Sequence, residues 1–312
     1  MRKFLLLVNP VLLHTASRHR DIDRVHRTFT EEGVAVDMLE TGENRAAGAK
    51  AKRAVEEGYD AVVVAGGDGT IFDVIQGLAG SSVPLGIIPY GTGNVLAQNL
   101  KVPTNPVAAA RWILKSSPRM VPLGRIHCCV PGGRESWLFA MAAGMGMHAS
   151  LMSEARRSGK SRVGKAAYFV AGAKLLLKHP VQPFDIAITT TSGSEVHQQV
   201  CEALAVRVAE LNRWRPGGDL DFPFLRLATV AGASRARLAR ASVAALFCSA
   251  GARDRLQPED AAAYYQDVSR VVIRPSAART YNPPLAIQAD GEVLGVSCAE
   301  IEMAGVSVTL FS

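Results

Sequence analysis

The sequence predicts two domains: an N-terminal α/β domain with a parallel sheet over residues 1–120, and a C-terminal all-β sandwich over residues 121–312. Short apolar runs alternate with amphipathic helical patterns in the first part, which is typical of a parallel sheet with helices on both faces. Strand-like runs follow, with few helical patterns between them. We leave open that the last of these strands returns to the first domain.

Four strands are expected in the first domain, and each ends in a polar or glycine-containing turn. The strands are Phe4–Val8, Val34–Leu39, the run beginning at Val62, and Pro84–Pro89; the helices are Ser17–Glu32, Arg45–Glu57, the segment after Thr70, Val95–Leu100 and Pro106–Ser116. Parallel sheets bind ligands at the carboxyl ends of their strands. One rim is therefore predicted from the turns at Asn9, Thr41, Gly66–Thr70 and Gly91–Asn94.

The stretch Val62–Leu78 joins a buried strand to a helix through the turn Gly66-Gly67-Asp68-Gly69-Thr70. Thr70 is expected to cap this helix, with Asp73 in a capping-box position. A glycine turn at a helix N-terminus gathers backbone N–H groups and favours an anion, most often a phosphate. Asp68 would then hold a cation, with Mg²⁺ the first choice, that bridges to phosphate oxygens. The alternative is ordinary turn chemistry without a ligand.

The second domain is expected to consist mainly of strands. They are predicted at Val121–Val130, Trp137–Ala142, Phe184–Thr191, Val196–Val208, Leu225–Val230, Val268–Ile273, Leu285–Gln288, Ala299–Met303 and Val306–Leu310. Two basic and apolar segments, Ser153–Lys178 and Ser234–Phe247, interrupt them. Such segments are typical of helices on an anionic membrane surface. Ordinary surface helices have the same composition, and that alternative stands for each segment.

Composition and charge narrow the classes of partner. The 48% hydrophobic and 20% charged content is typical of a globular protein, and the net charge of +7 suits an anionic partner such as a nucleotide or an anionic membrane. Aromatic residues make up only 6%, and no nucleic-acid-binding signature is found, so nucleic acid is not expected. We expect reduced thiols in a cytoplasmic protein from the scattered cysteines Cys128, Cys129, Cys201, Cys248 and Cys298.

Three motifs stand in this order along the chain: VVAGGDGT at 63–70, PLGIIPYGTGN at 84–94 and QADGE at 288–292. In their order and spacing they resemble the diacylglycerol kinase catalytic domain family, which includes bacterial lipid kinases and sphingosine kinases. The first motif alone is shared with NAD kinases and phosphofructokinases, and the combination is more specific. Further agreement comes from Asn9-Pro10, Thr41, Gly144-Met145-Gly146 and Gly164–Tyr168.

The resemblance implies ATP-dependent phosphorylation of diacylglycerol or a related long-chain lipid alcohol, in a cleft between an α/β nucleotide domain and a β-sandwich. It implies that Asp68 helps to hold Mg²⁺ and that Asp290 and Glu292 supply the catalytic base. A peripheral membrane location is expected for such an enzyme, and a homodimer is left open. The residues that would bind ATP are Asn9, Thr41, Gly66, Gly67, Asp68, Gly69, Thr70, Ile71, Phe72, Gly91, Thr92, Gly93 and Asn94.

The late motif Asp290-Gly291-Glu292 also has a physical interpretation of its own. An alcohol that attacks a phosphoryl group needs a carboxylate within hydrogen-bond reach to accept its proton. Asp290 and Glu292 would share one face if the segment is extended. The alternative is a plain Asp-Gly hairpin turn.

The sequence departs from the family pattern at several positions. Val95 and Asp73 stand where an acidic residue and a glutamate are usual, and His148 replaces the aspartate of a GxGxD pattern. Many bacterial members carry an acidic loop that holds a structural magnesium ion. The corresponding loop, Gly217–Pro223, is shortened here, so its aspartates are not assigned as ligands.

These departures keep a second hypothesis open, a nucleotide- and lipid-binding regulatory protein that has lost catalysis. A third hypothesis, an NAD kinase, ranks lower because the sequence contains no second glycine- and serine-rich nucleotide motif.

Overall fold

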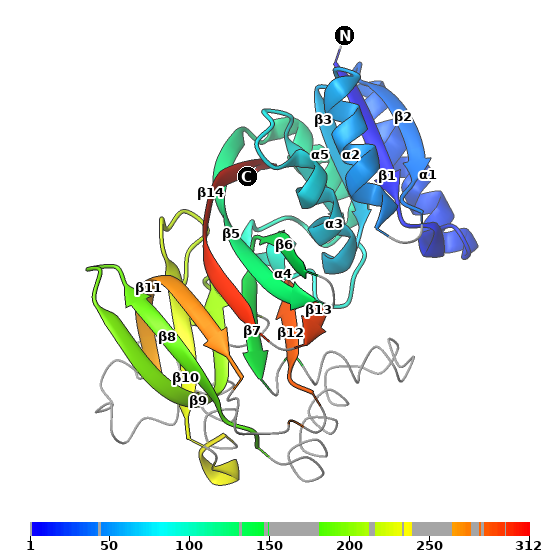
Figure 1. Ribbon diagram of the computed structural model, residues 1–312. Coiled ribbons are helices and arrows are strands. Elements are labelled where there is room, and N and C mark those ends of the chain that lie inside the picture. Colours follow the sequence, from blue (N-terminus) through cyan, green and yellow to red (C-terminus); the bar gives the residue numbers. More distant parts are fainter. Residues whose placement is uncertain are drawn as a thin grey trace. The chain divides into compact units, whose positions relative to one another are not determined.

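The computed structural model of the chain describes residues 2–42, 45–130, 133–146, 149, 181–211, 216–232, 234–238, 264–275, 281, 284–296 and 298–312. The chain divides into two compact units, Met1–Leu123 with Ala304–Ser312, and Gly124–Met303. The first unit is α/β with parallel strands, and the second is rich in strands (Figure 1), which confirms the predicted fold class.

The first unit is built on four parallel strands in the order β4–β3–β1–β2. Right-handed crossovers place α1 on one face of this sheet and α2 and α3 on the other. In agreement, α1 packs on α5 and α2 packs on α3. The strands are β1 (Lys3–Val8), β2 (Ala35–Glu40), β3 (Ala61–Gly66) and β4 (Leu85–Pro89); the helices are η1 (Pro10–Leu12), α1 (Ala16–Glu31), α2 (Ala46–Glu56), α3 (Asp68–Leu78), α4 (Val95–Asn99) and α5 (Pro106–Lys115).

The strand order creates a switch point between β1 and β3. From β1 the sheet continues to β2 on one side and to β3 on the other, and ligands of such sheets bind where the order reverses. The segments that leave the strands stay together at this edge. Asn9 N donates to the Ala65 carbonyl at 3.0 Å, and Tyr90 N donates to the Gly66 carbonyl at 2.9 Å. The turns after β1, β3 and β4 therefore form one rim.

The second unit consists of antiparallel strands that change partners along their length. β9 pairs with β8 in its first half and with β7 and β10 in its second half. β11 pairs with β10 and then with β8 and β14, so that β8, β9, β10 and β11 close a ring of paired strands. The strands are β5 (Pro118–Val130), β6 (Gly133–Phe139), β7 (Ala142–Gly146), β8 (Phe184–Thr190), β9 (Glu195–Val206), β10 (Leu225–Ala231), β11 (Tyr264–Arg274), β12 (Ala286–Ala289), β13 (Glu292–Val296) and β14 (Ala299–Phe311).

β14 is one strand where the sequence predicted two. Its residues Ala299–Glu302 pair with β11 in the second unit, and Leu310 pairs with Leu85 of β4 in the first unit. Gly305 interrupts the apolar pattern, and its backbone has φ 65°. This local irregularity explains why the periodicity suggested a break there.

The expectation of reduced cysteines is wrong for two of the five. Cys129 at the end of β5 and Cys298 just before β14 form a disulfide, with Cα atoms 5.4 Å apart. The backbone pairs there as well, since Cys129 N donates to the Cys298 carbonyl at 3.0 Å. Cys128 and Cys201 are buried free thiols, and burial raises their pKa values to about 11 and about 12. Cys248 lies outside the described residues.

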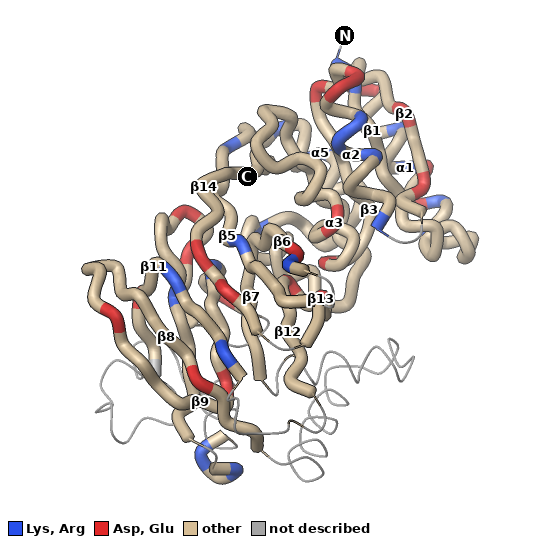
Figure 2. The backbone as a smooth tube through the Cα atoms, in the orientation of Figure 1, with Lys and Arg blue, Asp and Glu red and all other residues tan. Residues whose placement is uncertain are grey.

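Within the part of the chain that the structure describes, no helix is long and apolar enough to cross a membrane. Lys and Arg occur in both units and are interspersed with Asp and Glu (Figure 2). Outside the described residues lie His148, the stretch Gly164–Tyr168, the basic segment Ser153–Lys178 and positions 239–247 of the second basic segment.

Candidate functional site

The rim of the first unit brings Asn9 and Thr70 together at the switch point. Asn9 Nδ2 donates to Thr70 Oγ1 at 3.3 Å, and Asn9 Oδ1 accepts from Val11 N at 3.1 Å. Thr41 follows β2 on the same edge, where its backbone N–H donates to the Val8 carbonyl at 2.8 Å and its side chain is buried. The polar residues after β1, β2 and β3 thus lie at the carboxyl edge, where the sequence placed them.

The two glycine turns touch through Gly67 and Gly91. A Cβ on Gly91 would lie 2.7 Å from Gly67 Cα, and a Cβ on Gly67 would lie 3.1 Å from Gly91 Cα. Gly66 has no room for a side chain either, because its Cβ would lie 2.9 Å from Thr70 Oγ1. Glycine is needed where two backbones approach this closely. The three glycines Gly66, Gly67 and Gly91 thus let two stretches of backbone come into contact at the N-terminus of α3. We call this arrangement the cradle.

Asn94 fixes the shape of the second turn. Its Oδ1 accepts from Gly91 N and its Nδ2 donates to the Gly91 carbonyl, both at 2.7 Å. Its backbone is left-handed, with φ 48°. Asparagine is among the few residues other than glycine that tolerate this conformation. Between the two residues, Thr92 is exposed and Gly93 is half-buried.

The side chain of Asp68 links the first turn to α4. Its Oδ1 accepts a hydrogen bond from Val95 N at 2.9 Å, and a Cβ on Gly93 would lie 2.7 Å from its Oδ2. Burial raises the pKa of Asp68 above its ordinary value, although backbone N–H groups at the start of α4 oppose the shift. Asp68 therefore ties the two glycine turns together, a contact between residues 27 positions apart.

The predicted cap of α3 is wrong. The helix begins at Asp68 with Gly67 at the N-cap, so Thr70 lies in the first turn, where its hydroxyl accepts from Asn9. Asp73 is buried within the helix rather than in a capping position. Ile71 and Phe72 are 1% exposed, so their side chains belong to the core. Gly67 at the N-cap has no side chain that could accept from the first N–H groups of the helix.

Among the rim residues that the structure describes, Asp68 is the carboxylate that lies in the glycine turns and could hold a metal ion. The described residues contain no group of three or more His, Cys, Asp or Glu side chains that could hold one. Mg²⁺ in nucleotide sites is bound through one or two carboxylates together with phosphate oxygens and water. Asp68 therefore fits a Mg²⁺ ion that arrives with a nucleotide, and does not fit a dedicated protein metal site.

Asp290 and Glu292 belong to the second unit, where Asp290 lies in the tight turn between β12 and β13 and Glu292 is the first residue of β13. Ala289 pairs with Glu292, and the two turn residues, Asp290 and Gly291, have φ 48° and 85°. Two left-handed residues in a two-residue loop are typical of a type I′ turn. The idea that the two carboxylates share one face of an extended segment is therefore wrong, because Asp290 does not have extended backbone.

The carboxylate of Asp290 faces inward. Its Oδ2 accepts from Ala140 N at 2.8 Å, and its Oδ1 accepts from Met141 N and Ala142 N at 2.8 and 2.9 Å. The residue is 6% exposed. Glu292, by contrast, is half-buried. The hairpin thus presents one carboxylate to the interior and one nearer the surface.

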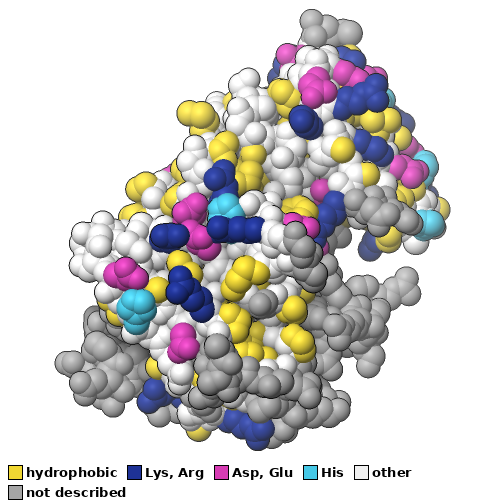
Figure 3. Space-filling view, in the orientation of Figure 1, with side chains coloured by type: hydrophobic (Ala, Val, Ile, Leu, Met, Phe, Trp, Pro, Cys, Tyr) yellow, Lys and Arg dark blue, Asp and Glu magenta, His cyan; other side chains and the backbone are white. Residues whose placement is uncertain are grey.

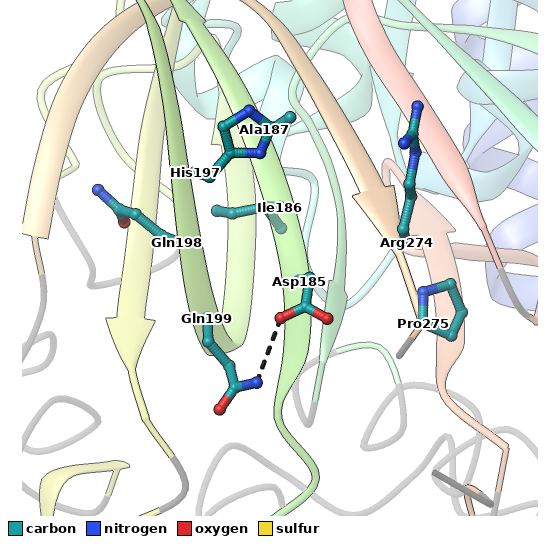
Figure 4. Close-up of a pocket in the computed structure, with 8 residues that line it drawn as sticks. All are labelled: Asp185, Ile186, Ala187, His197, Gln198, Gln199, Arg274 and Pro275. Carbon is teal, nitrogen blue, oxygen red and sulfur yellow. Dashed lines mark hydrogen bonds between the residues drawn. The ribbon is translucent and has the colours of Figure 1, made fainter. Parts of the chain in front are cut away.

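A pocket in the second unit lies apart from every predicted site residue in sequence. Its volume is about 560 Å³, and its lining comes from β8, β9 and the end of β11. Figure 4 shows the hydrogen bond from Gln199 Nε2 to Asp185 Oδ1, at 3.2 Å, on its wall. His197 and Arg274 also line it. We assign it no role.

Charged side chains of both signs gather on one face of the molecule (Figure 3). In the second unit Arg134 and Arg270 both pair with Glu300, and His127 Nε2 lies 3.6 Å from Glu302 Oε1. Burial raises the pKa of Glu300, but hydrogen bonds from the two arginines outweigh it and lower the pKa. These charges neutralise one another across β5, β6, β11 and β14, so they indicate a structural network.

One buried charge was not among the predicted residues. Arg207 directly follows β9 and is 0% exposed. Its guanidinium donates to the carbonyls of Leu220 and Phe222 at 2.7 and 3.2 Å. The signal in the sequence is an arginine inside the apolar run Ala203–Val208.

Comparison with known proteins points to one family. Residues 3–126 match the diacylglycerol kinase catalytic domain family. A diacylglycerol kinase of Mycobacterium tuberculosis is 35% identical over 194 residues, which are 61% of this chain and 60% of that protein. A diacylglycerol kinase of Staphylococcus saprophyticus is 33% identical over 129 residues, which are 41% of this chain and 40% of that protein. The chain thus spans 60% or less of the length of these two relatives.

Solved structures share the fold. A diacylglycerol kinase from Bacillus anthracis superposes with a TM-score of 0.65 at 19% identity, covering 99% of this chain and 96% of that one. Yeast NADH kinase superposes with a TM-score of 0.51 at 10% identity, covering 100% and 83%. At these identities the likeness concerns the fold alone.

Proposed function

Because residues 3–126 belong to the diacylglycerol kinase catalytic domain family, we propose that the chain transfers the γ-phosphoryl group of ATP to the hydroxyl of diacylglycerol or a related long-chain lipid alcohol. The observation that carries the proposal is the contact between Gly67 and Gly91, which forms a backbone cradle at the N-terminus of α3. The N-terminus of a helix favours a phosphate.

The first unit supplies the nucleotide side of the proposed reaction. The phosphates of ATP would lie against the cradle, with Asn9, Thr41, Thr70 and Thr92 around them. Mg²⁺, when bound with ATP, would neutralise charge on the phosphate oxygens, and Asp68 is the residue that would hold it. The hydrogen bonds between Asn94 and Gly91 keep the second turn in place before the nucleotide arrives.

The second unit supplies the base. In the proposed step the lipid hydroxyl oxygen bonds to the γ-phosphorus as the bond to ADP breaks, and a carboxylate accepts the hydroxyl proton. Glu292 suits this role, since it is half-buried. Asp290 already accepts three backbone hydrogen bonds with both of its oxygens, so we give it the role of positioning the hairpin.

The proposed lipid substrate lies in an anionic membrane. The net charge of +7 supports peripheral attachment to such a surface. Attachment would bring the enzyme to a substrate that does not leave the bilayer.

The proposal is tested by incubating the purified chain with labelled ATP, Mg²⁺ and a panel of lipids in mixed micelles, including diacylglycerol and single-chain long alcohols. Label is expected in the lipid fraction. Glu292→Gln is expected to reduce kcat by a factor of about 10² to 10⁴ with ATP affinity unchanged. Gly91→Ala is expected to weaken ATP binding, since its Cβ would lie 2.7 Å from Gly67 Cα. The matched control is Gly295→Ala, whose nearest neighbour would be Val130 Cγ1 at 3.9 Å.

The outcomes separate the two leading hypotheses. ATP binding without transfer to any lipid would exclude the kinase and favour a regulatory protein of the same fold. If the Glu292→Gln variant still transferred the phosphoryl group to lipid, Glu292 would not be the base.

A further inference from the structure

The loop at Gly217–Pro223 does not have the make-up of a metal site. The resemblance to bacterial lipid kinases would place an acidic, magnesium-binding loop here. The described residues hold no group of three side chains that could bind a metal, and the side chains of Asp219 and Asp221 are exposed. A cation nevertheless lies beneath the loop, and it is the guanidinium of Arg207.

The guanidinium of Arg207 holds the loop by donating hydrogen bonds to backbone carbonyls of the loop. Nη2 donates to the Leu220 carbonyl at 2.7 Å, and Nη1 donates to the Phe222 carbonyl at 3.2 Å and to Met303 Sδ at 2.9 Å. The loop also packs directly on the strand, because a Cβ on Gly218 would lie 2.9 Å from the Val208 carbonyl. Arg207 thus satisfies two backbone carbonyls of the loop.

The same arginine is linked to the hairpin of Glu292. Arg207 N donates to the Met141 carbonyl at 2.8 Å, and Met141 N donates to the Asp290 carboxylate at 2.8 Å. Strands β9, β7 and β12 are neighbours in the sheet, so the three residues lie at adjoining strand ends. Burial lowers the pKa of Arg207 to about 10, and the negative charge of Asp290 is the strongest influence that opposes this shift.

We propose that Arg207 is a positioning residue: it holds the Leu220–Phe222 loop, balances the buried carboxylate of Asp290, and so keeps the hairpin of Glu292 in shape without a divalent cation. Removing one partner of a buried pair of opposite charges is strongly destabilising, because the other charge is left uncompensated. An internal arginine is a permanent counter-charge, since it stays protonated. The loop can therefore be short.

The test is a thermal unfolding cycle on the full chain with Arg207→Met, Asp290→Asn and the double variant. Arg207→Met is expected to lower Tm by about 10 °C, because it leaves Asp290 without its counter-charge. The fall in Tm of the double variant is expected to be clearly smaller than the sum of the falls in Tm of the two single variants. The control is Arg226→Met, which breaks a more exposed pair with Asp267 and is expected to change Tm by about 3 °C or less. Additive losses in the double variant would overturn the pairing of charges.

A second experiment tests whether the stability of the fold is independent of a metal ion. Tm is measured in EDTA and in Mg²⁺ without nucleotide, in the Asp68→Asn background so that the rim of the first unit does not contribute. The two values are expected to agree. A rise of several degrees in Mg²⁺ would overturn the proposal, because it would show that a metal ion stabilises the fold elsewhere in the chain.

A third arm separates positioning from stability, and it rests on the proposed function. At a temperature where the variants are folded, Arg207→Met is expected to lower kcat for the lipid with KM for ATP unchanged. Arg207→Lys, which keeps the charge but not the fork of donors, is expected to recover part of kcat and of Tm. If Arg207→Met does not fold, Arg207→Lys and the double variant carry the test; no loss in either one would overturn the proposal. An inactive wild-type chain would refute the kinase and leave the unfolding cycle valid.

Discussion

At the scale of single residues, Asp290 and Glu292 have different surroundings although they stand two positions apart. The Asp290 carboxylate meets three backbone N–H groups of residues 140–142, at distances of 2.8 to 2.9 Å. Glu292 begins β13 and is half-buried. Asp290 has left-handed backbone in the turn, whereas Glu292 is the first residue of a strand.

Asp290→Asn is expected to lower the free energy of unfolding by about 2 to 3 kcal/mol, because an amide NH₂ cannot accept from a buried N–H. Glu292→Gln is expected to change it by less than about 1 kcal/mol. Chemical denaturation of both variants measures the difference. Equal losses would contradict the structural role given to Asp290.

Asp68→Asn tests the buried carboxylate of the rim. Burial raises the pKa of Asp68 above its ordinary value of 3.8, so the folded state binds its proton more tightly than the unfolded state. Stability from this group is fully present below the ordinary pKa and is lost as pH rises through the raised value. An asparagine keeps an acceptor for Val95 N and carries no charge.

We therefore expect Asp68→Asn to be at least as stable as the wild type at neutral pH, and the advantage to shrink as pH falls toward the ordinary pKa. Thermal unfolding at a series of pH values checks this expectation. A variant that is less stable at neutral pH would show that the ionised carboxylate stabilises the fold.

At the scale of elements, α2 and α3 pack through glycines. A Cβ on Gly77 would lie 2.0 Å from the Gly48 carbonyl oxygen, and a Cβ on Gly48 would lie 2.6 Å from the Asp73 carbonyl oxygen. The helices therefore approach each other closely. The arrangement places α3, and with it the cradle, at a fixed distance from α2.

The substitution Gly77→Ala separates the effect of packing between α2 and α3 from the effect of helix propensity. In a solvent-exposed helix this change stabilises by about 1 kcal/mol. Here the clash with the Gly48 carbonyl decides the sign, and a loss of about 3 kcal/mol is expected. Gly295→Ala, which meets only Val130 Cγ1 at 3.9 Å, is the control. A Gly77→Ala protein with raised Tm would contradict the contact.

At the scale of the whole molecule, the end of the chain completes the first unit. Val308 and Leu310 of β14 are 0% exposed, and Leu310 pairs with Leu85 of β4. Gly80 N donates to the Ser307 carbonyl at 2.8 Å, and Thr309 Oγ1 donates to the Ser81 carbonyl at 3.3 Å. The α/β fold of residues 1–123 is therefore incomplete without the last strand.

A chain truncated after Met303 is expected to lose the first unit's cooperative unfolding and its affinity for ATP. Removal of two fully buried aliphatic side chains alone corresponds to about 3 to 6 kcal/mol. Circular dichroism and ATP titration measure both effects. Deletion of Ser312 alone, which removes an exposed contact with Arg119, is the control and should change little. If the chain truncated after Met303 bound ATP with wild-type affinity, the first unit would not depend on its last strand for ATP binding.

The sequence by itself determined the α/β and strand-rich classes, the rim of glycine turns and the family resemblance. These features depend on local periodicity and on residues close in the chain, such as Val62–Thr70. Tertiary structure alone decided the inward orientation of Asp290, the Cys129–Cys298 disulfide, the return of β14 and the burial of Arg207. Each of these depends on contacts between distant positions, 148 to 150 residues apart for Asp290 and 169 for the disulfide. Periodicity within one element carries no information about such partners, because they are set by how the strands pair.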